Sequence, residues 1–411
     1  MLSCIYWGAL FGGAITSILF NIPGEAWSVA TTFDGYPMAQ QGKAAEALTA
    51  AFTSSFIGSF VAVVLITFLA PGIASFALRF GPPEFFAVYF LTFCSFVGLG
   101  REAKHKTIIS MALGLLLAAV GMDTVSGQLR MTFGFDALLR GVNFLVAVIG
   151  LFGISEILLT MEERLALRGH SASIKLKVVL KVWKEMPRYW VTLLRSSAIG
   201  CWLGITPGGA IAASFMGYNL AKRFAKDPST FGKGRIEGVF APETAAHASG
   251  TSALLPMLAL GIPGSGTAAI LLGGLMVWGL NPGPLLFVEH KDFVWAVIAS
   301  MYLGNVVGLV IVLTTVPVFA SILRVPFAAV APMIVVSCAI GAYAIQNAMF
   351  DVWLMLIFGV VGYVFKKIGV PLAPFTLALV LGNRSEDAFR LSMIGAGGDL
   401  RVFWSNGLVG S

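Results

Sequence analysis

Long apolar stretches dominate this chain and limit what it can fold into. Five are long enough to cross the hydrocarbon core of a bilayer as a helix, near residues 50–70, 84–100, 141–160, 293–320 and 327–346. Charged residues make up 11% of the 411 residues, whereas hydrophobic residues make up 57%. Because so few ionisable groups cannot cover a water-facing surface of this size, a soluble, disordered or disulfide-stapled chain is excluded. The sequence therefore predicts an all-α, polytopic integral membrane protein.

Other apolar stretches are shorter, at 3–20, 107–121, 190–205, 209–221, 245–262, 264–280, 350–365 and 370–382. Most of them adjoin Pro-Gly pairs. Pro lacks a backbone N–H and Gly permits backbone geometry that is closed to other residues, so such pairs break helices. Irregular backbone at membrane depth is tolerated where protein or a cavity covers it. The pattern predicts half-helices or re-entrant hairpins at the Pro-Gly motifs.

The net charge of +7 arises from basic residues in short segments between the apolar stretches. That placement sets membrane topology and implies no nucleic-acid partner. Loops 101–106 and 164–188 are the most basic, so both are expected to be cytoplasmic. Segment 171–189 interleaves basic and apolar residues, which fits either a helix lying on the inner leaflet or a solvated linker. The N-terminus lacks a basic region, so a cleaved signal peptide is not expected.

An internal repeat relates the two halves of the chain. Ile22-Pro23-Gly24 recurs as Ile262-Pro263-Gly264, and the segment from Pro71 to Arg79 recurs from Pro317 to Arg324. Gly98 pairs with Gly341 and Gly114 with Gly359, so the offset stays within 240 to 246 residues. An ordered series of matches at one offset predicts a structural repeat.

Equivalent loops of the two copies differ in charge. Loop 101–106 is basic, whereas its counterpart 345–351 has no basic residue and the next loop carries Lys366 and Lys367. This reversal predicts an inverted-topology repeat, an arrangement characteristic of secondary transporters. The expected divisions are a first membrane repeat at 1–160, incomplete at its N-terminus, a basic connector at 161–190, a second repeat at 191–382, and a polar C-terminal segment at 383–411.

Three Pro-Gly breaks are the candidate binding elements. A helix that restarts after a break presents free N–H groups and about half a positive charge, which suits an anionic ligand. Simple kinking is the alternative at any single break. The candidate substrate-binding residues lie at or beside the breaks: Asn21, Pro23, Gly24, Thr206, Pro207, Gly208, Gly209, Gly261, Pro263, Gly264, Ser265 and Gly266. Nearby hydroxyl groups, which could donate to a ligand, belong to Thr206, Ser214, Ser265 and Thr267.

Acidic residues near the breaks are candidates for ion coupling. Glu25 and Asp34 flank the first break and could bind a cation, or could simply be solvated at a hairpin tip. Glu243 and His247 lie four residues apart, so they can share a helix face and carry a proton or cation. A metal centre would need more ligands, and the other His residues lie elsewhere. We expect Na⁺ or H⁺ as the coupling ion, with Glu25 and Glu243 as candidates, and no catalytic residues, metal or cofactor.

Seven motifs resemble the large membrane subunit of the tripartite tricarboxylate transporter family (TctA family). They begin at Asn21 (NIPGEA), Asp34 (DGYPMA), Phe80 (FGPPE), Ala221 (AKRF, then FGKG), Glu237 (EG, then APE), Gly261 (GIPGS) and Leu280 (LNPGP). The resemblance implies a permease in a bacterial inner membrane, which works with a small membrane subunit and a periplasmic solute-binding protein. It also implies uptake of a small carboxylate that is driven by an ion gradient instead of ATP. Consistent with this, the sequence contains no Walker A pattern.

The sequence departs from the family pattern in places. Family members are expected to begin earlier, with another Pro-Gly motif, and to end with another apolar span. In the second copy Pro207 precedes Pro263 by 56 residues, whereas 22 residues precede Pro23. A degenerate or truncated membrane scaffold is therefore an alternative to a transporter. An intramembrane enzyme should show a cluster of ionisable catalytic residues, and none stands out.

Overall fold

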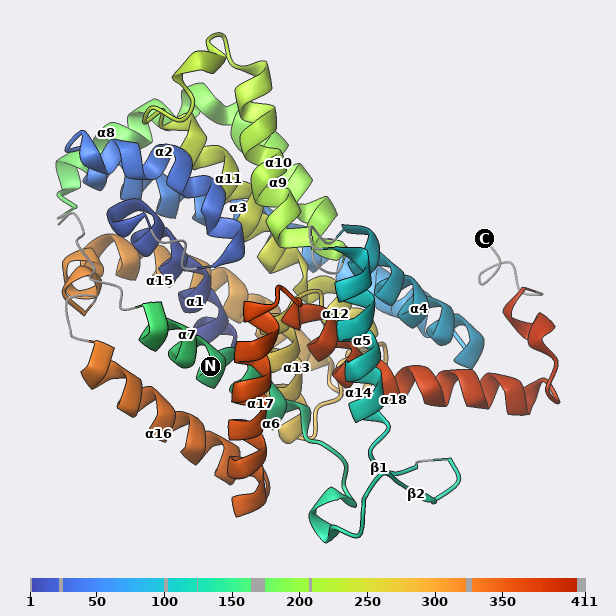
Figure 1. Cartoon of the computed structure of the whole chain (residues 1–411). Helices are drawn as coiled ribbons and strands as arrows, with labels where there is room; N and C mark the ends of the chain where they lie inside the picture. The colour runs from blue at the N-terminus through green and yellow to red at the C-terminus, as the bar shows by residue number, and fades with distance from the viewer. Residues whose placement is uncertain are drawn as a thin grey trace. The chain divides into compact units, whose positions relative to one another are not determined.

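The computed structural model describes residues 2–21, 25–99, 103–123, 125–163, 174–206, 209–322 and 327–404. Within these ranges the regular structure is helical (Figure 1), apart from one antiparallel pair of two-residue strands, β1 (Gly121–Met122) and β2 (Leu129–Arg130). The all-α class predicted from the apolar stretches is confirmed.

Contacts divide the chain into two compact units, each built from two segments that are far apart in sequence. Unit 1 comprises 1–75 and 166–325, and unit 2 comprises 76–165 and 326–411. The chain passes between the units near the ends of two long helices, α3 (Ala44–Ala77) and α15 (Lys291–Ile322). These helices carry Pro71 and Pro317, which the sequence repeat pairs. The predicted repeat boundaries and the inversion remain predictions.

Unit 1 contains the segments that carry the Pro-Gly breaks. Besides α3 and α15, its elements are α1 (Leu2–Phe20), η1 (Ala26–Ser28), α2 (Val29–Gln40), α8 (Leu176–Glu185), η4 (Met186–Tyr189), α9 (Trp190–Ile205), α10 (Gly209–Phe224), η5 (Pro228–Thr230), α11 (Glu237–Ser252), α12 (Leu254–Leu260), α13 (Gly266–Val277) and α14 (Leu286–Glu289). Helix α8 forms within the basic connector and buries Val179 and Val182. Its place on the inner leaflet remains a prediction.

Unit 2 contains the remaining helices and the β-hairpin. Its elements are α4 (Pro82–Leu99), α5 (Lys104–Ala118), η2 (Asp136–Leu138), α6 (Phe144–Val148), the π-helical turn η3 (Ile149–Ile154), α7 (Ser155–Glu163), α16 (Phe327–Gln346), α17 (Met349–Lys367), α18 (Leu372–Gly395) and η6 (Leu400–Phe403). In sequence order α3, α4 and α5 cover the first predicted copy, and α15, α16 and α17 cover the second.

Membrane-spanning helices are present in both units. Among the described residues, four segments are long and apolar enough to cross a bilayer: Ala44–Ala77, Phe144–Glu162, Lys291–Pro317 and Met349–Lys367. Shorter apolar helices cover Gly8–Phe20, Pro82–Gly98, Thr267–Val277 and Ala331–Gln346. A polytopic membrane protein with helices of unequal length is thus confirmed.

Two helices extend beyond their predicted apolar stretches. The stretch 245–262 is divided between α11 and α12, and α11 begins earlier, at Glu237. Helix α18 continues past residue 382 to Gly395. In both cases polar residues are helical because protein partners satisfy their side chains, an arrangement that hydropathy alone does not detect.

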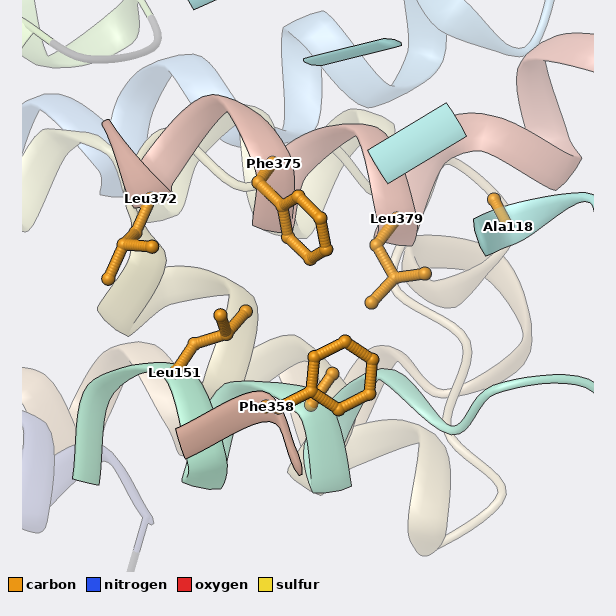
Figure 2. Close-up of a cluster of buried hydrophobic side chains, with 7 residues drawn as sticks. Ala118, Leu151, Phe358, Leu372, Phe375 and Leu379 are labelled. Carbon is orange, nitrogen blue, oxygen red and sulfur yellow. The ribbon is translucent and has the colours of Figure 1, made fainter. Parts of the chain in front are cut away.

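The core of unit 2 is formed by helix pairs in close contact. Phe358 of α17 and Phe375 of α18 face each other in Figure 2, with ring centroids 6.3 Å apart. Helices α5 and α18 approach so closely that a Cβ atom on Gly114 would lie 2.3 Å from the Phe375 carbonyl oxygen. Its repeat partner Gly359 also lies at a close crossing, where a Cβ would meet Ile154 at 2.4 Å. Small residues therefore set the helix spacing at matching points of the two copies.

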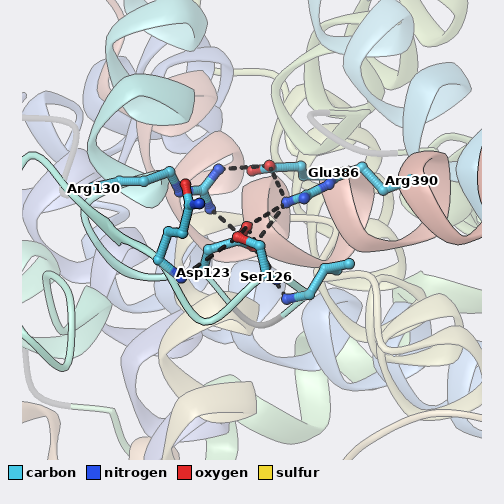
Figure 3. Close-up of polar contacts among 7 residues, drawn as sticks. Asp123, Ser126, Arg130, Glu386 and Arg390 are labelled. Carbon is cyan, nitrogen blue, oxygen red and sulfur yellow. Dashed lines mark hydrogen bonds and ion pairs between the residues drawn. The ribbon is translucent and has the colours of Figure 1, made fainter.

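An ion-pair cluster attaches the β-hairpin to the polar end of α18 (Figure 3). Arg390 Nη1 lies 2.7 Å from Asp123 Oδ2, and Arg130 Nη1 lies 2.6 Å from Glu386 Oε1. The Arg390 guanidinium and the Ser126 hydroxyl hold the pKa of Asp123 well below its usual range. These four charged groups account for the helical continuation of α18 beyond the apolar stretch.

Replacing Gly114 by Val tests the close crossing of α5 and α18. Overpacking at a tight contact typically costs about 1–3 kcal/mol, so we expect Gly114→Val to lower the thermal unfolding temperature in detergent clearly. The matched control is Gly98→Val in α4, where a Cβ would meet nothing within 4 Å. Equal unfolding temperatures for the two variants would contradict the packing account.

Candidate functional site

Helix α11 lies at the centre of unit 1 and is buried along its whole length. Every residue from Glu237 to Ser252 is buried, although the helix carries two carboxylates, a His and several hydroxyl groups. It packs against α9, α10 and α2. A helix with so many polar groups is stable in this position only because neighbouring helices supply partners and exclude lipid.

Glycines on three neighbouring helices make this burial possible. A Cβ atom on Gly58 of α3 would lie 2.2 Å from the Thr244 carbonyl oxygen, and one on Gly200 of α9 would lie 2.3 Å from the Ala245 carbonyl oxygen. Gly217 of α10 approaches the Ala241 carbonyl in the same way, at 2.8 Å. The helices therefore contact the backbone of α11 directly, as small-residue packing in membranes allows.

The third Pro-Gly break separates α12 from α13. Gly261 ends α12 in the left-handed conformation with φ 72°, and its N–H donates to the Met257 carbonyl at 3.0 Å. Ser265 then caps α13, because its hydroxyl oxygen accepts the Ala268 N–H at 3.1 Å. Pro263 and Gly264 between them are buried. The sequence correctly predicts a helix end and a new helix start here.

The second break separates α9 from α10. Helix α9 ends at Ile205, and α10 begins at Gly209. Thr206 uses its hydroxyl to donate to the Leu203 carbonyl at 2.7 Å. The predicted site residues Pro207 and Gly208 lie outside the described residues.

The first break follows α1. Asn21 has φ 57°, a left-handed conformation that ends the helix, and Glu25 precedes η1. The Glu25 N–H donates to the Ser28 hydroxyl at 3.1 Å, which starts the new turn. The predicted site residues Pro23 and Gly24 lie outside the described residues.

Segments that flank the three breaks line one small cavity inside unit 1. Its lining residues come from α1, η1, α9, α10, α11, the α11–α12 junction and the third break: Tyr6, Trp27, Gly204, Thr206, Gly209, Ala210, Ser249, Gly250, Ala253, Gly264 and Ser265. Four predicted site residues are therefore brought together, namely Thr206, Gly209, Gly264 and Ser265. Asn21, Glu25, Gly261 and Pro263 do not line the cavity. Gly266 begins α13 directly after Ser265.

The cavity lies at the starts of two helices. Gly209 and Ala210 are the first residues of α10, and Ser265 is the N-cap of α13. The lining contains no Lys or Arg among the described residues. Two helix N-termini and their N–H groups are expected to give a positive potential here, which is the physical basis of anion binding in many proteins.

Hydroxyl groups at the cavity differ in whether they are available to a ligand. Ser214 donates to the Trp27 carbonyl at 2.6 Å, so it holds η1 and does not face the cavity, contrary to the sequence-based expectation. The Tyr6 hydroxyl donates to the Gly250 carbonyl at 2.5 Å. The Ser249 hydroxyl is buried and has no hydrogen-bond partner among the described residues. Ser249 and Tyr6 were not predicted, since isolated polar residues in apolar sequence give no spacing signal.

Glu243, a candidate for ion coupling, is buried on α11. Its carboxylate accepts hydrogen bonds from the Thr31 hydroxyl at 2.6 Å and the Ser55 hydroxyl at 3.0 Å. His247 Nδ1 lies 3.4 Å from Glu243 Oε2. Glu25 lies close enough for its charge to interact with that of Glu243. The described residues contain no group of three or more His, Cys, Asp or Glu side chains suited to a metal ion.

Asp34 does not act as a hairpin-tip charge. It is fully buried, and its Oδ1 accepts the backbone N–H groups of Gly232, Gly234 and Arg235 at 2.8–2.9 Å. Its Oδ2 accepts the Tyr218 hydroxyl at 2.9 Å. Because four protein donors use both oxygens, Asp34 fixes the loop before α11 and is not free to bind a cation.

Comparison with known proteins identifies the family. The model of the Tripartite tricarboxylate transporter TctA family matches residues 1–377. The "Uncharacterized 52.8 kDa protein in TAR-I ttuC' 3'region" of Agrobacterium vitis is 37% identical over 415 residues, which cover 100% of this chain and 82% of the relative. The "Uncharacterized protein in TAR-II ttuC' 3'region" of the same organism is 37% identical over 213 residues, covering 52% of this chain and 88% of the relative. No solved structure matches the chain.

A multi-span membrane protein with broken helices around a buried cavity has the architecture of a membrane transport protein. The chain belongs to the tripartite tricarboxylate transporter TctA family, since the family model covers nearly all of it. The resemblance inferred from the sequence motifs is therefore confirmed.

Replacing Asp34 tests its role in holding the loop before α11. Asp34→Ala leaves three backbone N–H groups and a hydroxyl without their acceptor. Charge-assisted hydrogen bonds are worth about 2 kcal/mol, so we expect trypsin to cleave after Lys233 or Arg235 roughly tenfold faster or more. Asp227→Ala, which removes a surface carboxylate bonded to its neighbour Ser229, is the control. Unchanged cleavage of Asp34→Ala would refute the assignment.

Proposed function

We propose that this chain is the permease subunit of a secondary transporter that imports a small, tricarboxylate-like anion across the inner (cytoplasmic) membrane of a bacterial cell. A periplasmic solute-binding protein delivers the anion, and a small membrane subunit completes the complex. Family membership supports the three-component arrangement. An ion gradient supplies the driving force.

The observation that carries this proposal is the convergence of the three broken segments on one cavity. Residues far apart in sequence, from Tyr6 to Ser265, line a space bordered by two helix starts. Broken helices that meet in this way form substrate sites in other transporter folds. Unrelated kinks would have no reason to share one cavity.

A carboxylate fits the chemistry of this cavity. The N-termini of α10 and α13 present N–H donors, and Ser249 offers a hydroxyl without a protein partner. Such a site binds an anion without the cost of burying a Lys or Arg in the membrane. The residues that line the opened site would determine which carboxylate binds.

Substrate entry requires the helices around the cavity to separate. The cavity volume is about 10 Å³, close to the minimum that a single water molecule needs. A carboxylate of several carbon atoms is larger. Alternating access, in which the broken segments part on one side of the membrane at a time, would create the room.

Two carboxylates, Glu243 and Glu25, are the candidates for binding the coupling ion. Glu243 is buried, and Glu25 is half-buried and within electrostatic range of it. Buried carboxylates in membrane helices are costly and commonly mark ion or proton pathways. We assign the coupling ion, Na⁺ or H⁺, to this region.

Exchanging Ser265 for Asp tests the anion site without removing the helix cap. Asp is as good an N-cap as Ser, so α13 should remain stable, whereas its negative charge at the cavity opposes a bound carboxylate. We expect Ser265→Asp to lower uptake of labelled carboxylates by the complete three-component system roughly tenfold or more. A tenfold loss corresponds to about 1.4 kcal/mol of binding free energy.

Ser265→Asn is the matched control because it keeps the cap and the size of the side chain but adds no charge. It should retain most of the wild-type uptake. Equal uptake by the Asp and Asn variants would remove the anion site from this cavity. Absence of uptake by the wild-type complex would favour a membrane scaffold over a permease.

A further inference from the structure

Glu243 and His247 form an isolated ionisable pair inside unit 1. They lie one turn apart on α11, and their side chains are 3% and 2% exposed, respectively. His247 Nδ1 lies 3.4 Å from Glu243 Oε2 and 3.1 Å from the backbone oxygen of the same residue. The ring also packs against Phe11 of α1, with centroids 5.2 Å apart. The pair is therefore enclosed by its own helix and α1.

In the part of the chain that the structure describes, the groups around this pair carry no permanent positive charge. Thr31 of α2 and Ser55 of α3 donate hydroxyl hydrogen bonds to the carboxylate. The other titratable groups that face this region are Glu25, before η1, and Tyr6 of α1, both of which are acids. Among the described residues, Glu243 forms one ion pair, with His247. A buried carboxylate without a fixed cation is neutralised by binding a proton or a mobile cation.

The ligands at this position favour a proton over a sodium ion. Hard cations take oxygen ligands, whereas a His nitrogen lies beside Oε2. Both carboxylate oxygens already accept a hydroxyl hydrogen, which leaves the Nδ1 side as the place for an added proton. A proton bound at Oε2 or at Nδ1 changes the charge of the pair from −1 to 0. His is also the side chain whose protonation is most easily exchanged near neutral pH.

A direct connection along α11 links the pair to the cavity. Ser249 and Gly250, which line the cavity, follow His247 by two and three residues on the same buried helix. The second ring nitrogen, Nε2, is buried and has no hydrogen-bond partner among the described residues. Helix α1 also supplies Tyr6, whose hydroxyl bonds to the Gly250 carbonyl. The charge of the pair therefore acts on both helices that border the cavity from this side.

We propose that Glu243 and His247 bind the proton that is co-transported with the anion, so that one proton enters the pair when the substrate enters the cavity. This inference rests on the proposed transport function. Loading the proton neutralises the pair on α11, the helix that supplies Ser249 and Gly250 to the cavity, which favours binding of the anion. Release of the proton on the cytoplasmic side restores the negative charge and favours release of the anion. Coupling of this kind is reciprocal, since the anion also favours the protonated pair.

The test compares two transport modes of the same purified complex in sealed vesicles. The first mode is accumulation of labelled carboxylate driven by an inward proton gradient without Na⁺. The second is exchange of labelled for unlabelled carboxylate at equal pH, which needs no net proton movement. A gradient of one pH unit supports roughly tenfold accumulation per proton. We expect Glu243→Gln to abolish this accumulation while exchange stays within about threefold of wild type.

His247→Gln is the second variant and should reduce proton-driven accumulation while retaining exchange. Glu46→Gln, a carboxylate on α3 paired with Lys181 at the surface, is the control and should preserve both modes. Full proton-driven accumulation in Glu243→Gln, or wild-type accumulation driven by Na⁺ alone, would overturn the proton pair. Loss of both modes in the wild type would instead refute the transport function. Should Glu243→Gln lose both modes, retained exchange in His247→Gln is required for the proposal to stand.

Discussion

The constraint on which unit 1 depends is the burial of a polar helix in a chain otherwise suited to lipid. Helix α11 carries Glu237, Glu243 and His247 with every residue buried. Such a helix cannot face hydrocarbon, because each uncharged polar group without a hydrogen-bond partner would cost about 2–7 kcal/mol there. A charged group would cost more. Partners from other helices must therefore surround it, and the close approach at Gly58, Gly200 and Gly217 makes that possible. The position of the broken segments follows from this arrangement.

The broken segments likewise form a candidate site whose described residues include no buried Lys or Arg side chain. Where α10 and α13 begin, the backbone itself supplies donors and a positive potential, and the cavity lining holds no Lys or Arg among the described residues. A fixed cation would bind an anion more tightly, yet a carrier must also release its ligand. Helix N-termini give a moderate field that a nearby proton can modulate. Glu243 and His247, which are buried on the central helix, are placed to provide that modulation.

Much of the fold could be predicted from the sequence because hydrophobicity and helix breaks are local properties. The apolar stretches form helices, and α1, α9 and α12 end near their Pro-Gly motifs as expected. The lengths differ in places: 84–100 and 327–346, predicted long enough to cross, give shorter apolar helices, whereas 350–365, predicted short, lies in the candidate span Met349–Lys367. The family assignment also followed from ordered motifs. The long-range partners could not be predicted: the start of α11 at Glu237 depends on Thr192 and Arg235, which bind its carboxylate, and no periodicity indicates that contact. Likewise Asp34 resembled a surface charge, whereas its partners lie about 200 residues away.

Part of the cavity lining could be predicted for the same reason. Pro-Gly motifs locate helix breaks, so Thr206, Gly209, Gly264 and Ser265 were found, and the structure brings them to one cavity. Tyr6, Trp27 and Ser249 complete the lining but belong to segments with no motif of their own. Their role depends on tertiary packing around α11. The continuation of α18 through its polar end has a similar origin, in the ion pairs with Asp123 and Arg130.

The central claim is that backbone amides at two helix starts hold the substrate carboxylate. Solid-state NMR distance measurement between a ¹³C-carboxyl-labelled transported anion and ¹⁵N-labelled glycine and alanine amides tests it most directly, using the complete complex in lipid bilayers. The account predicts dephasing from amides at Gly209, Ala210 and Gly266, at carbon–nitrogen distances of about 4 Å, as expected for hydrogen bonds of about 2.9 Å. A bound anion that dephases only Lys or Arg side-chain nitrogens in a parallel sample would contradict it.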